Sequence, residues 1–381
     1  MKKVVHLLPA LEQGGVESVV CALNRAAARA GWASVVVSAG GRRTAEIERD
    51  GGVHRLLDVR SKNPLTAPLR AWRLRRLLVA EKPDLVCVHS RVPAWLFALG
   101  CRGLGIPLVT YAHGANSVSA YSAVMTRGER VVTPSIFLAD YLKKNYTFDR
   151  DKLRVIPPAV DTDRFDPSAV DTAFTAQKWL DWKLAGRYVV MAVGRLSRVK
   201  GLETLIGAVA ELKRTIPEVR CVLVGDADPR HEDYLDELRG TAVRLGVGDD
   251  VVFVGGQTRI PECLSLADVV VSANTAKPET FGLSMAEAIV MGKPVVAHGF
   301  GGALEVVRDG TDGVLTEGDS PAAFAEAILR VKDEAIRPSR DEAVERFGFA
   351  RMTSSTFELY EDVSLCVAEA ADGSWREENR K

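Results

Sequence analysis

The sequence predicts an α/β protein with two doubly wound domains. Three observations support this prediction: a length of 381 residues, a repeated alternation of short apolar strands with helical stretches, and a break in that rhythm near Pro157-Pro158. Chains of this length usually form two domains. Strands that alternate with helices favour a parallel sheet covered on both faces. Because 47% of the residues are hydrophobic and 26% are charged, a largely disordered chain is excluded.

The expected strands are short, apolar and rich in β-branched residues, as strands buried on both faces are. The first series is expected at Val4–Leu8, Ala33–Ser38, Leu85–His89, Leu108–Tyr111, Arg130–Thr133 and Leu153–Ile156. The second series is expected at Tyr188–Val193, Val219–Val224, Val251–Val254, Val269–Ser272 and Pro294–Ala297. Such sheets bind ligands at the carboxyl ends of their strands, so two facing domains of this kind would form a cleft.

The expected helices lie between and after these strands. They are Val16–Ala30, Leu69–Ala80, Leu202–Thr215, Asp233–Leu245, Ala322–Lys332 and Phe349–Val367. We place the first domain at residues 1–165, a linker at 166–186 and the second domain at 187–348. Residues 349–381 are expected to form a helix that packs back on the first domain, followed by a polar, frayed tail from Asp372.

Composition and charge indicate where the protein is located and what kind of partner it binds. The formal net charge is zero, but residues 1–170 carry 25 basic and 15 acidic residues, whereas the rest carry 25 and 35. The first domain is therefore expected to face something anionic. The apolar run Val4–Leu11 contains His6 and Pro9, which favours a buried strand over a signal peptide and predicts a cytoplasmic protein. We expect no nucleic-acid partner.

The six cysteines lie far apart and form no C-x-x-C pair. This spacing favours reduced, buried thiols over a disulfide or a zinc site. No Asp-rich metal motif appears either, and we expect neither a metal nor a separate cofactor.

A glycine pair follows the first expected strand, in the segment Gln13-Gly14-Gly15-Val16-Glu17. Glycine lets backbone N–H groups approach an anion, and the start of a helix adds partial positive charge. The spacing differs from the dinucleotide fingerprint, so a nicotinamide cofactor is not supported. An ordinary tight turn is the alternative interpretation.

A basic loop, Gly194-Arg195-Leu196-Ser197-Arg198-Val199-Lys200-Gly201, follows the first expected strand of the second domain. Cations at the carboxyl end of a strand are well placed to bind a diphosphate. Arg195 can bind it as a planar fork and Lys200 as a point charge. A solvated basic loop is the alternative.

The segment Pro278-Glu279-Thr280-Phe281-Gly282-Leu283-Ser284-Met285-Ala286-Glu287 leads from a strand and a polar loop into a helix, expected from about Gly282 to Met291. The first N–H groups of this helix, at Thr280–Leu283, would form a second anion site. Glu279 and Glu287 could accept hydrogen bonds from the hydroxyls of a sugar or a ribose. The alternatives are an acid that stabilises the helix start and an acid on the helix surface.

These motifs, in this order, resemble the retaining glycosyltransferases of family 4, and the resemblance covers nearly the whole chain. It also includes Ala112-His113-Gly114, the stretch from Ile156 to Phe165, and Gly301-Gly302-Ala303-Leu304-Glu305-Val306-Val307 ahead of Asp312-Gly313. Many relatives have Asn-Gly or Pro-Gly where this chain has Pro158-Ala159. This difference lies near the hinge between the two domains and bears on the conformation of that hinge. The resemblance implies the GT-B architecture of two facing Rossmann-like domains with a cleft between them.

The resemblance also implies roles for individual residues. The donor-binding residues would be Gly14, Gly15, Arg195, Lys200, Arg259, Ile260, Glu279, Thr280, Phe281, Gly282, Leu283 and Glu287. Among these, Glu279 would contact the transferred sugar, Glu287 the ribose, and the loop at Arg259-Ile260 the base. The residues closest to the chemistry would be His113, Glu279, Arg195 and Lys200.

The predicted activity is therefore transfer of a hexose-type sugar from a nucleoside-diphosphate donor to a glycan or lipid-linked acceptor, with retention of anomeric configuration. Cell-surface polysaccharide or lipopolysaccharide synthesis would be the setting. Arg195, Lys200 and the helix start would stabilise the leaving diphosphate in place of a metal. Two alternatives stay open: a sugar-nucleotide epimerase of the same architecture, and a non-catalytic sugar-nucleotide-binding subunit.

The acceptor side is less clearly marked. Arg91-Val92-Pro93-Ala94-Trp95 follows an expected strand end and suits an anionic or sugar acceptor, although a packed helix start explains Trp95 equally well. Glu17 is a further candidate acceptor contact. The basic stretch Leu69–Leu78 fits peripheral binding to the anionic inner face of a membrane, or a packed helix with a solvated basic face.

Overall fold

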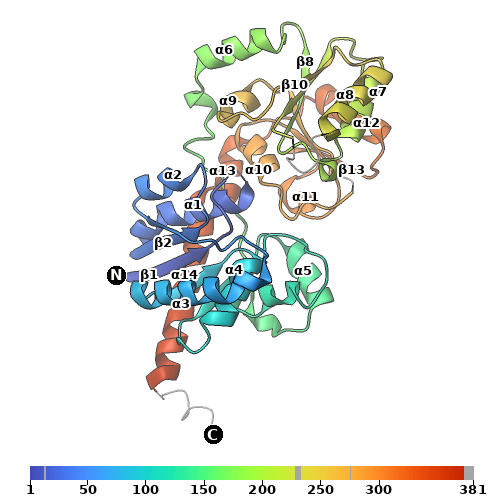
Figure 1. Ribbon diagram of the computed structural model, residues 1–381. Helices are drawn as coiled ribbons and strands as arrows, with labels where there is room; N and C mark the ends of the chain where they lie inside the picture. The colour runs from blue at the N-terminus through green and yellow to red at the C-terminus, as the bar shows by residue number, and fades with distance from the viewer. Residues whose placement is uncertain (13, 228–232, 275, 373–381) are drawn as a thin grey trace. The chain divides into compact units, whose positions relative to one another are not determined.

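The computed structural model describes residues 1–12, 14–227, 233–274 and 276–372, with side chains as far as residue 365. Gln13 of the glycine turn and the tail beyond Asp372 lie outside these ranges. The chain forms two compact units, one of residues 1–159 with the helix that begins at Phe349, the other of Val160–Gly348. Each unit is built on one parallel sheet flanked by helices (Figure 1). The predicted α/β class with two doubly wound sheets is confirmed.

The first unit has a seven-stranded sheet in the order β3-β2-β1-β4-β5-β6-β7. Its strands are β1 Lys2–Leu7, β2 Trp32–Ser38, β3 Val53–Leu56, β4 Leu85–Val88, β5 Leu108–Tyr111, β6 Arg130–Thr133 and β7 Leu153–Val155. Val4 pairs with Leu85 and Val5 with Val35. The strand order reverses between β1 and β4, which is where open parallel sheets bind ligands.

Helices cover both faces of this sheet. They are α1 Gly15–Ala27, α2 Thr44–Arg49, α3 Ala67–Glu81, α4 Arg91–Gly100, α5 Ile136–Asn145 and α14 Phe349–Asp372. Val4 points into a core shared with α1 and α14, whereas its neighbour Val5 points into a core shared with α3 and α4. Alternate residues of a strand face opposite ways, so a strand buried on both faces is apolar throughout.

The second unit has a six-stranded sheet in the order β10-β9-β8-β11-β12-β13. Its strands are β8 Tyr188–Val193, β9 Val219–Val224, β10 Val251–Phe253, β11 Val269–Ser272, β12 Val295–His298 and β13 Gly313–Thr316. Its helices are α6 Thr172–Asp181, α7 Leu202–Leu212, α8 Asp233–Arg244, α9 Ile260–Ser265, α10 Leu283–Val290, α11 Ala303–Val306, α12 Pro321–Asp333 and α13 Arg340–Phe347. The order reverses between β8 and β11.

Several observed elements were not among those expected from the sequence, and β3, β13 and α6 show why. β3 reads Val-His-Arg-Leu and is mostly exposed at the edge of its sheet, so it lacks the apolar signal of a central strand. β13 is only four residues long and begins with glycine. α6 lies within the expected linker and has no buried residue; Asp171, which accepts hydrogen bonds from two backbone N–H groups, caps its start.

Five of the six cysteines are buried free thiols, and Cys366 lies beyond the described side chains. Within the described ranges, no helix combines the length and the apolar character needed to cross a bilayer.

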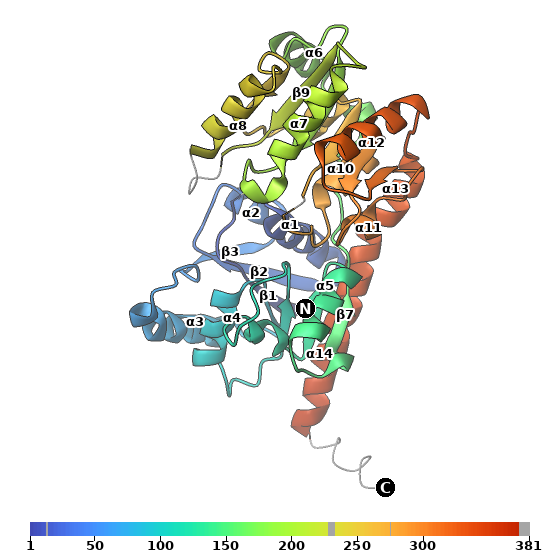
Figure 2. The same cartoon turned by 90° about the vertical axis from the view of Figure 1, so that its right-hand side faces the viewer.

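The helix α14 completes the core of the first unit, and Figures 1 and 2 both show it running alongside that unit's sheet. Its Tyr360 is fully buried and lies edge-on to Trp32, with ring centroids 5.7 Å apart. The Tyr360 hydroxyl lies 2.9 Å from the Tyr111 hydroxyl of β5. Burial raises the pKa of both tyrosines, Tyr111 and Tyr360, far above the usual value. This bond therefore joins two neutral hydroxyls inside the core.

We expect Tyr111→Phe and Tyr360→Phe each to lower the free energy of unfolding by about 1–3 kcal/mol, because each leaves a buried hydroxyl without its partner. The double variant should lose clearly less than the sum, since both polar groups are then gone. Urea unfolding of the four proteins measures the difference. Tyr146→Phe, at a partly exposed tyrosine, serves as the control, and strictly additive losses would contradict the coupling.

Candidate functional site

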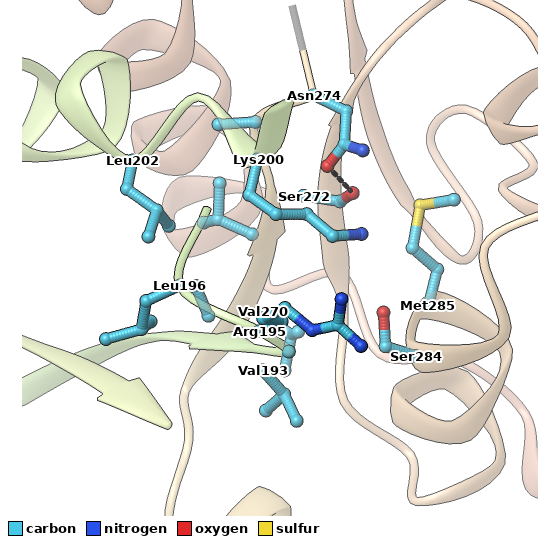
Figure 3. A pocket seen from close by; sticks show the side chains of 14 residues that line it. Val193, Arg195, Leu196, Lys200, Leu202, Val270, Ser272, Asn274, Ser284 and Met285 are labelled. Carbon is cyan, nitrogen blue, oxygen red and sulfur yellow. Dashed lines mark hydrogen bonds between the residues drawn. The ribbon is translucent and has the colours of Figure 1, made fainter. Parts of the chain in front are cut away.

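A pocket opens in the second unit at the carboxyl ends of β8 and β11, the two strands between which the strand order reverses. Arg195 and Lys200 line it from the loop after β8, Asn274 from the loop after β11, and Ser284 from α10. Figure 3 shows the Arg195 and Lys200 side chains reaching into this pocket toward Ser284 and Asn274. Polar groups from three separate segments thus converge at the switch point of the sheet.

Lys200 and Glu279 form an ion pair in which the Lys200 ammonium donates to Glu279 Oε1. Asn274 Nδ2 donates to the same oxygen at 3.1 Å. Lys200 ends a short 3₁₀ turn, and Gly201 follows it with φ 59°, a left-handed conformation that glycine adopts without strain. The turn fixes Lys200 at the start of α7, and the two predicted residues, 79 positions apart in the chain, are in contact.

Arg195 is exposed, and no hydrogen bond or ion pair from any described residue holds its guanidinium. Unlike Lys200, it is therefore available to an anionic ligand as a planar pair of donors. Asn274 was missed in the sequence analysis. Its position two residues after β11, at the same edge as the basic loop, is the signal that could have identified it.

The loop that carries Glu279 is fixed by its neighbours. Phe281 is buried in the core, and the Glu279 carbonyl accepts from Gly302 N–H at 2.8 Å. A Cβ atom on Gly302 would lie 2.6 Å from Phe281 Cα, so only glycine allows this close approach of two backbones. Gly302 belongs to the motif Gly301–Val307, for which the sequence alone indicated no role.

α10 begins after Gly282, which has φ 97°. Its bonding within the helix starts with Met285 N–H to the Gly282 carbonyl at 2.9 Å. The N–H groups of Leu283 and Ser284 therefore point out of the helix start, as an anion site requires. Leu283, Ser284 and Glu287 form its partly exposed face, so Glu287 lies one turn along from Ser284.

The predicted base-binding loop is engaged elsewhere. Arg259 Nη1 donates to Asp171 Oδ2 at 2.5 Å, and its guanidinium lies 5.0 Å from the centre of the Phe174 ring. Arg259 thus holds α6 and is not among the residues that line the pocket. Ile260, the first residue of α9, packs partly buried against the core.

In the first unit, the glycine pair marks the start of a helix as predicted. Gly14 precedes α1 in extended conformation, and Gly15 is the first helical residue and is exposed. Glu17 lies in the first turn. The neighbouring Ser18 accepts from Arg43 Nη1 at 3.0 Å.

His113 is part of a row of three imidazoles. Its Nε2 lies 3.0 Å from Nδ1 of His89, whose Nε2 lies 3.1 Å from Nδ1 of His6. Burial lowers the pKa of His113 to about 4 and that of His6 to about 3. The pKa of His89 is also lowered far below its usual value, by burial first and then by the two neighbouring histidines. All three rings are therefore neutral at pH 7.

No role was expected for His6 and His89 from the sequence. His6 lies on β1, His89 directly after β4 and His113 shortly after β5, and these strands are neighbours in the sheet. Strand order could not be read from the sequence, which is why the row went unrecognised.

Arg91 and Trp95 meet around Tyr121, which was not singled out from the sequence. Arg91 Nη1 donates to Ser122 Oγ at 3.1 Å, and its guanidinium lies 5.4 Å from the centre of the Tyr121 ring. The Trp95 ring lies parallel to the Tyr121 ring at 6.2 Å, with an interplanar angle of 12°. Arg127 lies 5.3 Å from the Trp95 ring. The result is a stack in the order Arg91–Tyr121–Trp95–Arg127.

Comparison with known proteins agrees with this geometry. Residues 13–164 match the family described as Glycosyltransferase Family 4, and residues 181–347 match the family described as Glycosyl transferases group 1. The chain is 34% identical to a D-inositol 3-phosphate glycosyltransferase of Acidothermus cellulolyticus, over 67% of this chain and 60% of that protein. It is 30% identical to a GDP-mannose-dependent alpha-(1-6)-phosphatidylinositol monomannoside mannosyltransferase of Mycobacterium tuberculosis, over 71% of this chain and 73% of that protein.

The fold is also that of a solved structure, the Anabaena protein HepE in complex with UDP and glucose. The two align with a TM-score of 0.83 at 23% identity, over 95% of this chain and 100% of that one. At this identity the likeness concerns the architecture, which is the one expected from the sequence.

The neutral imidazole row predicts a pH dependence of stability. Because the folded pKa values of these histidines lie below the usual 6.5, the unfolded chain binds more protons between about pH 6.5 and 4. The free energy of unfolding should therefore fall as pH is lowered through this window, by up to about 1.4 kcal/mol per pH unit for each histidine. Urea unfolding between pH 7.5 and 4.5 measures the slope.

His6→Leu should flatten that slope, because one proton fewer is taken up on unfolding. His298→Gln is the matched control, since His298 lies in the other unit and outside the row. A slope unchanged by His6→Leu would show that His6 does not carry this dependence.

Proposed function

The chain belongs to glycosyltransferase family 4, and from this membership we propose that it transfers a hexose from a nucleoside-diphosphate donor with retention of anomeric configuration. The observation that carries the proposal is the Lys200–Glu279–Asn274 cluster at the switch point of the second sheet, beside Arg195, with which no described residue pairs. Such a cluster offers cations for phosphates and a carboxylate for hydroxyls.

The transfer requires the bond between the anomeric carbon and a diphosphate oxygen to break. Positive charge then builds on the sugar ring, and negative charge builds on the leaving diphosphate. Arg195, Lys200 and the N–H groups at the start of α10 would stabilise that negative charge, which is commonly the largest contribution in such catalysis. These protein groups would supply the charge without a metal ion or a separate cofactor.

Glu279 would accept hydrogen bonds from hydroxyls of the transferred sugar, and Glu287 from those of the ribose. A carboxylate beside a diphosphate repels it unless a cation lies between them. The contact of Lys200 with Glu279 supports this assignment, because Lys200 can neutralise the carboxylate and contact the phosphates together. Gly14, Gly15 and His113 are assigned the donor contacts that the family resemblance implies. Arg259-Ile260 keeps the proposed contact with the base, for which Arg259 would have to exchange its ion pair with Asp171 for the ligand.

Retention is explained if the acceptor hydroxyl attacks from the face that the diphosphate leaves. The hydroxyl proton then passes to an oxygen of the departing diphosphate, and the new bond forms on the same face of the ring. No side chain needs to act as the base. The two alternative functions predict different products: an epimerase alters the donor sugar without an acceptor, and a binding subunit alters nothing.

For the acceptor, we propose a phosphate-bearing glycan or lipid-linked glycan. The names of the two relatives specify inositol phosphate and phosphatidylinositol mannoside acceptors, both anionic. The Arg91–Tyr121–Trp95–Arg127 stack offers cations for a phosphate and aromatic edges for sugar rings. Glu17 would contact acceptor hydroxyls. Lipopolysaccharide and phosphoinositide glycans both have this chemistry, and trials with each class distinguish them.

We further propose peripheral contact of α3 with an anionic membrane on its cytoplasmic face. Leu65 just before this helix is 89% exposed, and Leu69 and Trp72 are each 50% exposed. Arg73 and Arg76 are exposed alongside them. Apolar side chains flanked by cations suit insertion at the boundary between headgroups and acyl chains.

The remaining two arginines of α3 are used within the fold. Arg70 is buried and donates to the Asn63 carbonyl at 2.9 Å, while Arg75 donates to the Gly100 carbonyl at 3.1 Å. Arg70 and Arg75 are therefore not counted among the cations of the basic stretch Leu69–Leu78 that could face a membrane. Only Arg73 and Arg76 are assigned to the membrane.

We expect Arg195→Ala and Lys200→Ala each to reduce turnover on the order of 10²-fold without unfolding the protein. Lys200→Ala should weaken donor binding more, because it leaves Glu279 uncompensated beside the diphosphate. Adding Glu279→Gln to Lys200→Ala should recover part of the binding and none of the turnover. Thermal shift with UDP and GDP measures binding, and nucleotide release from UDP-glucose or GDP-mannose with acceptor measures turnover.

Arg198→Ala is the matched control, because Arg198 lies in the same loop but pairs with Glu237. Near-normal turnover of both Arg195→Ala and Lys200→Ala would refute the assignment of the diphosphate. The anomeric configuration of the product, read by NMR, tests retention directly.

On vesicles with anionic lipid at low salt, we expect Arg73→Gln with Arg76→Gln to weaken binding about 10-fold or more, since each cation near the surface contributes about 1 kcal/mol. Trp72→Ala should weaken it further. Binding of the unchanged protein should fall as salt rises and the Debye length shortens to about 8 Å. Co-sedimentation measures all of these.

Lys144→Gln with Arg150→Gln removes the same charge from exposed positions on other elements and is the control. Equal losses in the two double variants would mean that overall charge, and not α3, drives binding. No binding at low salt would refute membrane contact altogether.

A further inference from the structure

The imidazole row crosses the first sheet at its switch point. His6 comes from β1, His89 follows β4 and His113 follows β5, and the two gaps between ring nitrogens are 3.1 and 3.0 Å. His6 is fully buried and His89 is 3% exposed, whereas His113 is partly exposed. The row therefore runs from the core of the unit outward to a residue that a ligand can reach.

The row has only two self-consistent arrangements of protons. A neutral imidazole carries one N–H and one bare nitrogen, so each ring donates on one side and accepts on the other. In the first arrangement His6 Nδ1–H donates to His89 Nε2, and His89 Nδ1–H donates to His113 Nε2. In the second both bonds are reversed, and His6 carries its proton on Nε2.

The inner end of the row distinguishes the two. His6 Nε2 is buried and has no hydrogen-bond partner among the described residues. The second arrangement would bury an unpaired N–H group there, whereas the first leaves an unpaired acceptor. Orphaned buried N–H groups are the rarer of the two in proteins. The first arrangement is therefore favoured, and it places the proton of His113 on Nδ1.

We propose that His6 and His89 are positioning residues that hold His113 as the neutral tautomer protonated at Nδ1. His113 Nε2 then accepts from His89, so its lone pair is occupied and the ring is no general base. Its Nδ1–H is a fixed donor for an oxygen atom. Given the proposed function, that oxygen belongs to the transferred sugar. The site would discriminate against a sugar that lacks the matching hydroxyl, because the Nδ1–H group of His113 would not have that hydroxyl as its acceptor.

The tautomer can be read directly by NMR. In protein labelled with ¹⁵N-histidine, long-range ¹H–¹⁵N correlations distinguish a protonated nitrogen from a bare one, and single substitutions assign the rings. We expect His6, His89 and His113 all to carry their proton on Nδ1 at pH 7.5. A wild-type spectrum with His113 protonated on Nε2 would overturn the proposal, with no variant needed.

Two substitutions at the inner end test the coupling. His6→Leu removes the donor, so His113 should lose its single tautomer. Turnover should fall roughly tenfold, by analogy with metal-ligating histidines, for which loss of the orienting hydrogen bond typically costs 10–100-fold. His6→Asn retains an amide donor near the place of Nδ1 and should restore both within about twofold. His54→Leu, outside the row and bonded to Ser38, should change neither. An unchanged tautomer and turnover in His6→Leu would refute the coupling.

The same samples separate this proposal from the proposed function. Thermal shift by UDP or GDP should be the same in the wild type, His6→Leu and His6→Asn, because His6 touches no ligand. If neither nucleotide shifts the wild type and no sugar is transferred, the proposed function fails. The tautomer of His113 would still be decided by the NMR spectra alone.

Discussion

The constraint on which the rest of the structure depends is that the strands within each sheet run parallel. Parallel neighbours need a crossover, so the loop after every strand emerges at the same edge. Where the strand order reverses, adjacent loops diverge and leave room for a ligand. The ion pair of Lys200 with Glu279 lies at this point in one unit, and the imidazole row lies at it in the other.

The two units place different chemistry at the same topological position. In the second unit, full charges meet: a lysine paired with a carboxylate, and an arginine with which no described residue pairs. In the first unit, burial lowers the pKa of the three histidines so far that they stay neutral. The charged groups of the second unit suit a diphosphate whose negative charge grows during reaction. The neutral imidazoles of the first unit suit a hydroxyl, which needs a directed hydrogen bond and no charge.

The sequence predicted most of this fold because strands buried on both faces are continuous apolar runs. β3 and β13 were missed because an exposed edge in β3 and an initial glycine in β13 weaken that signal. Arg195, Lys200 and Glu279 were found because each follows a strand end, a position visible in the sequence. His6, His89, Asn274 and Tyr121 were not, since their contacts depend on strand order and loop paths. Helical periodicity likewise marked α3 as basic but did not show that Arg70 turns back to Asn63.

These contacts also bear on where the acceptor's proton goes. The Glu279 carboxylate already accepts from Lys200 and Asn274. In the proposed tautomer, the bare nitrogen of His113 already accepts from His89. The His113 ring then offers no free lone pair to an attacking hydroxyl, and the remaining lone pairs of the Glu279 carboxylate are assigned to hydroxyls of the transferred sugar. The diphosphate oxygen that leaves the sugar gains negative charge as the bond breaks, so it becomes a better proton acceptor when one is needed. Under the proposed function, deprotonation would wait until the donor bond is breaking, and this order would favour attack from the face on which the diphosphate leaves.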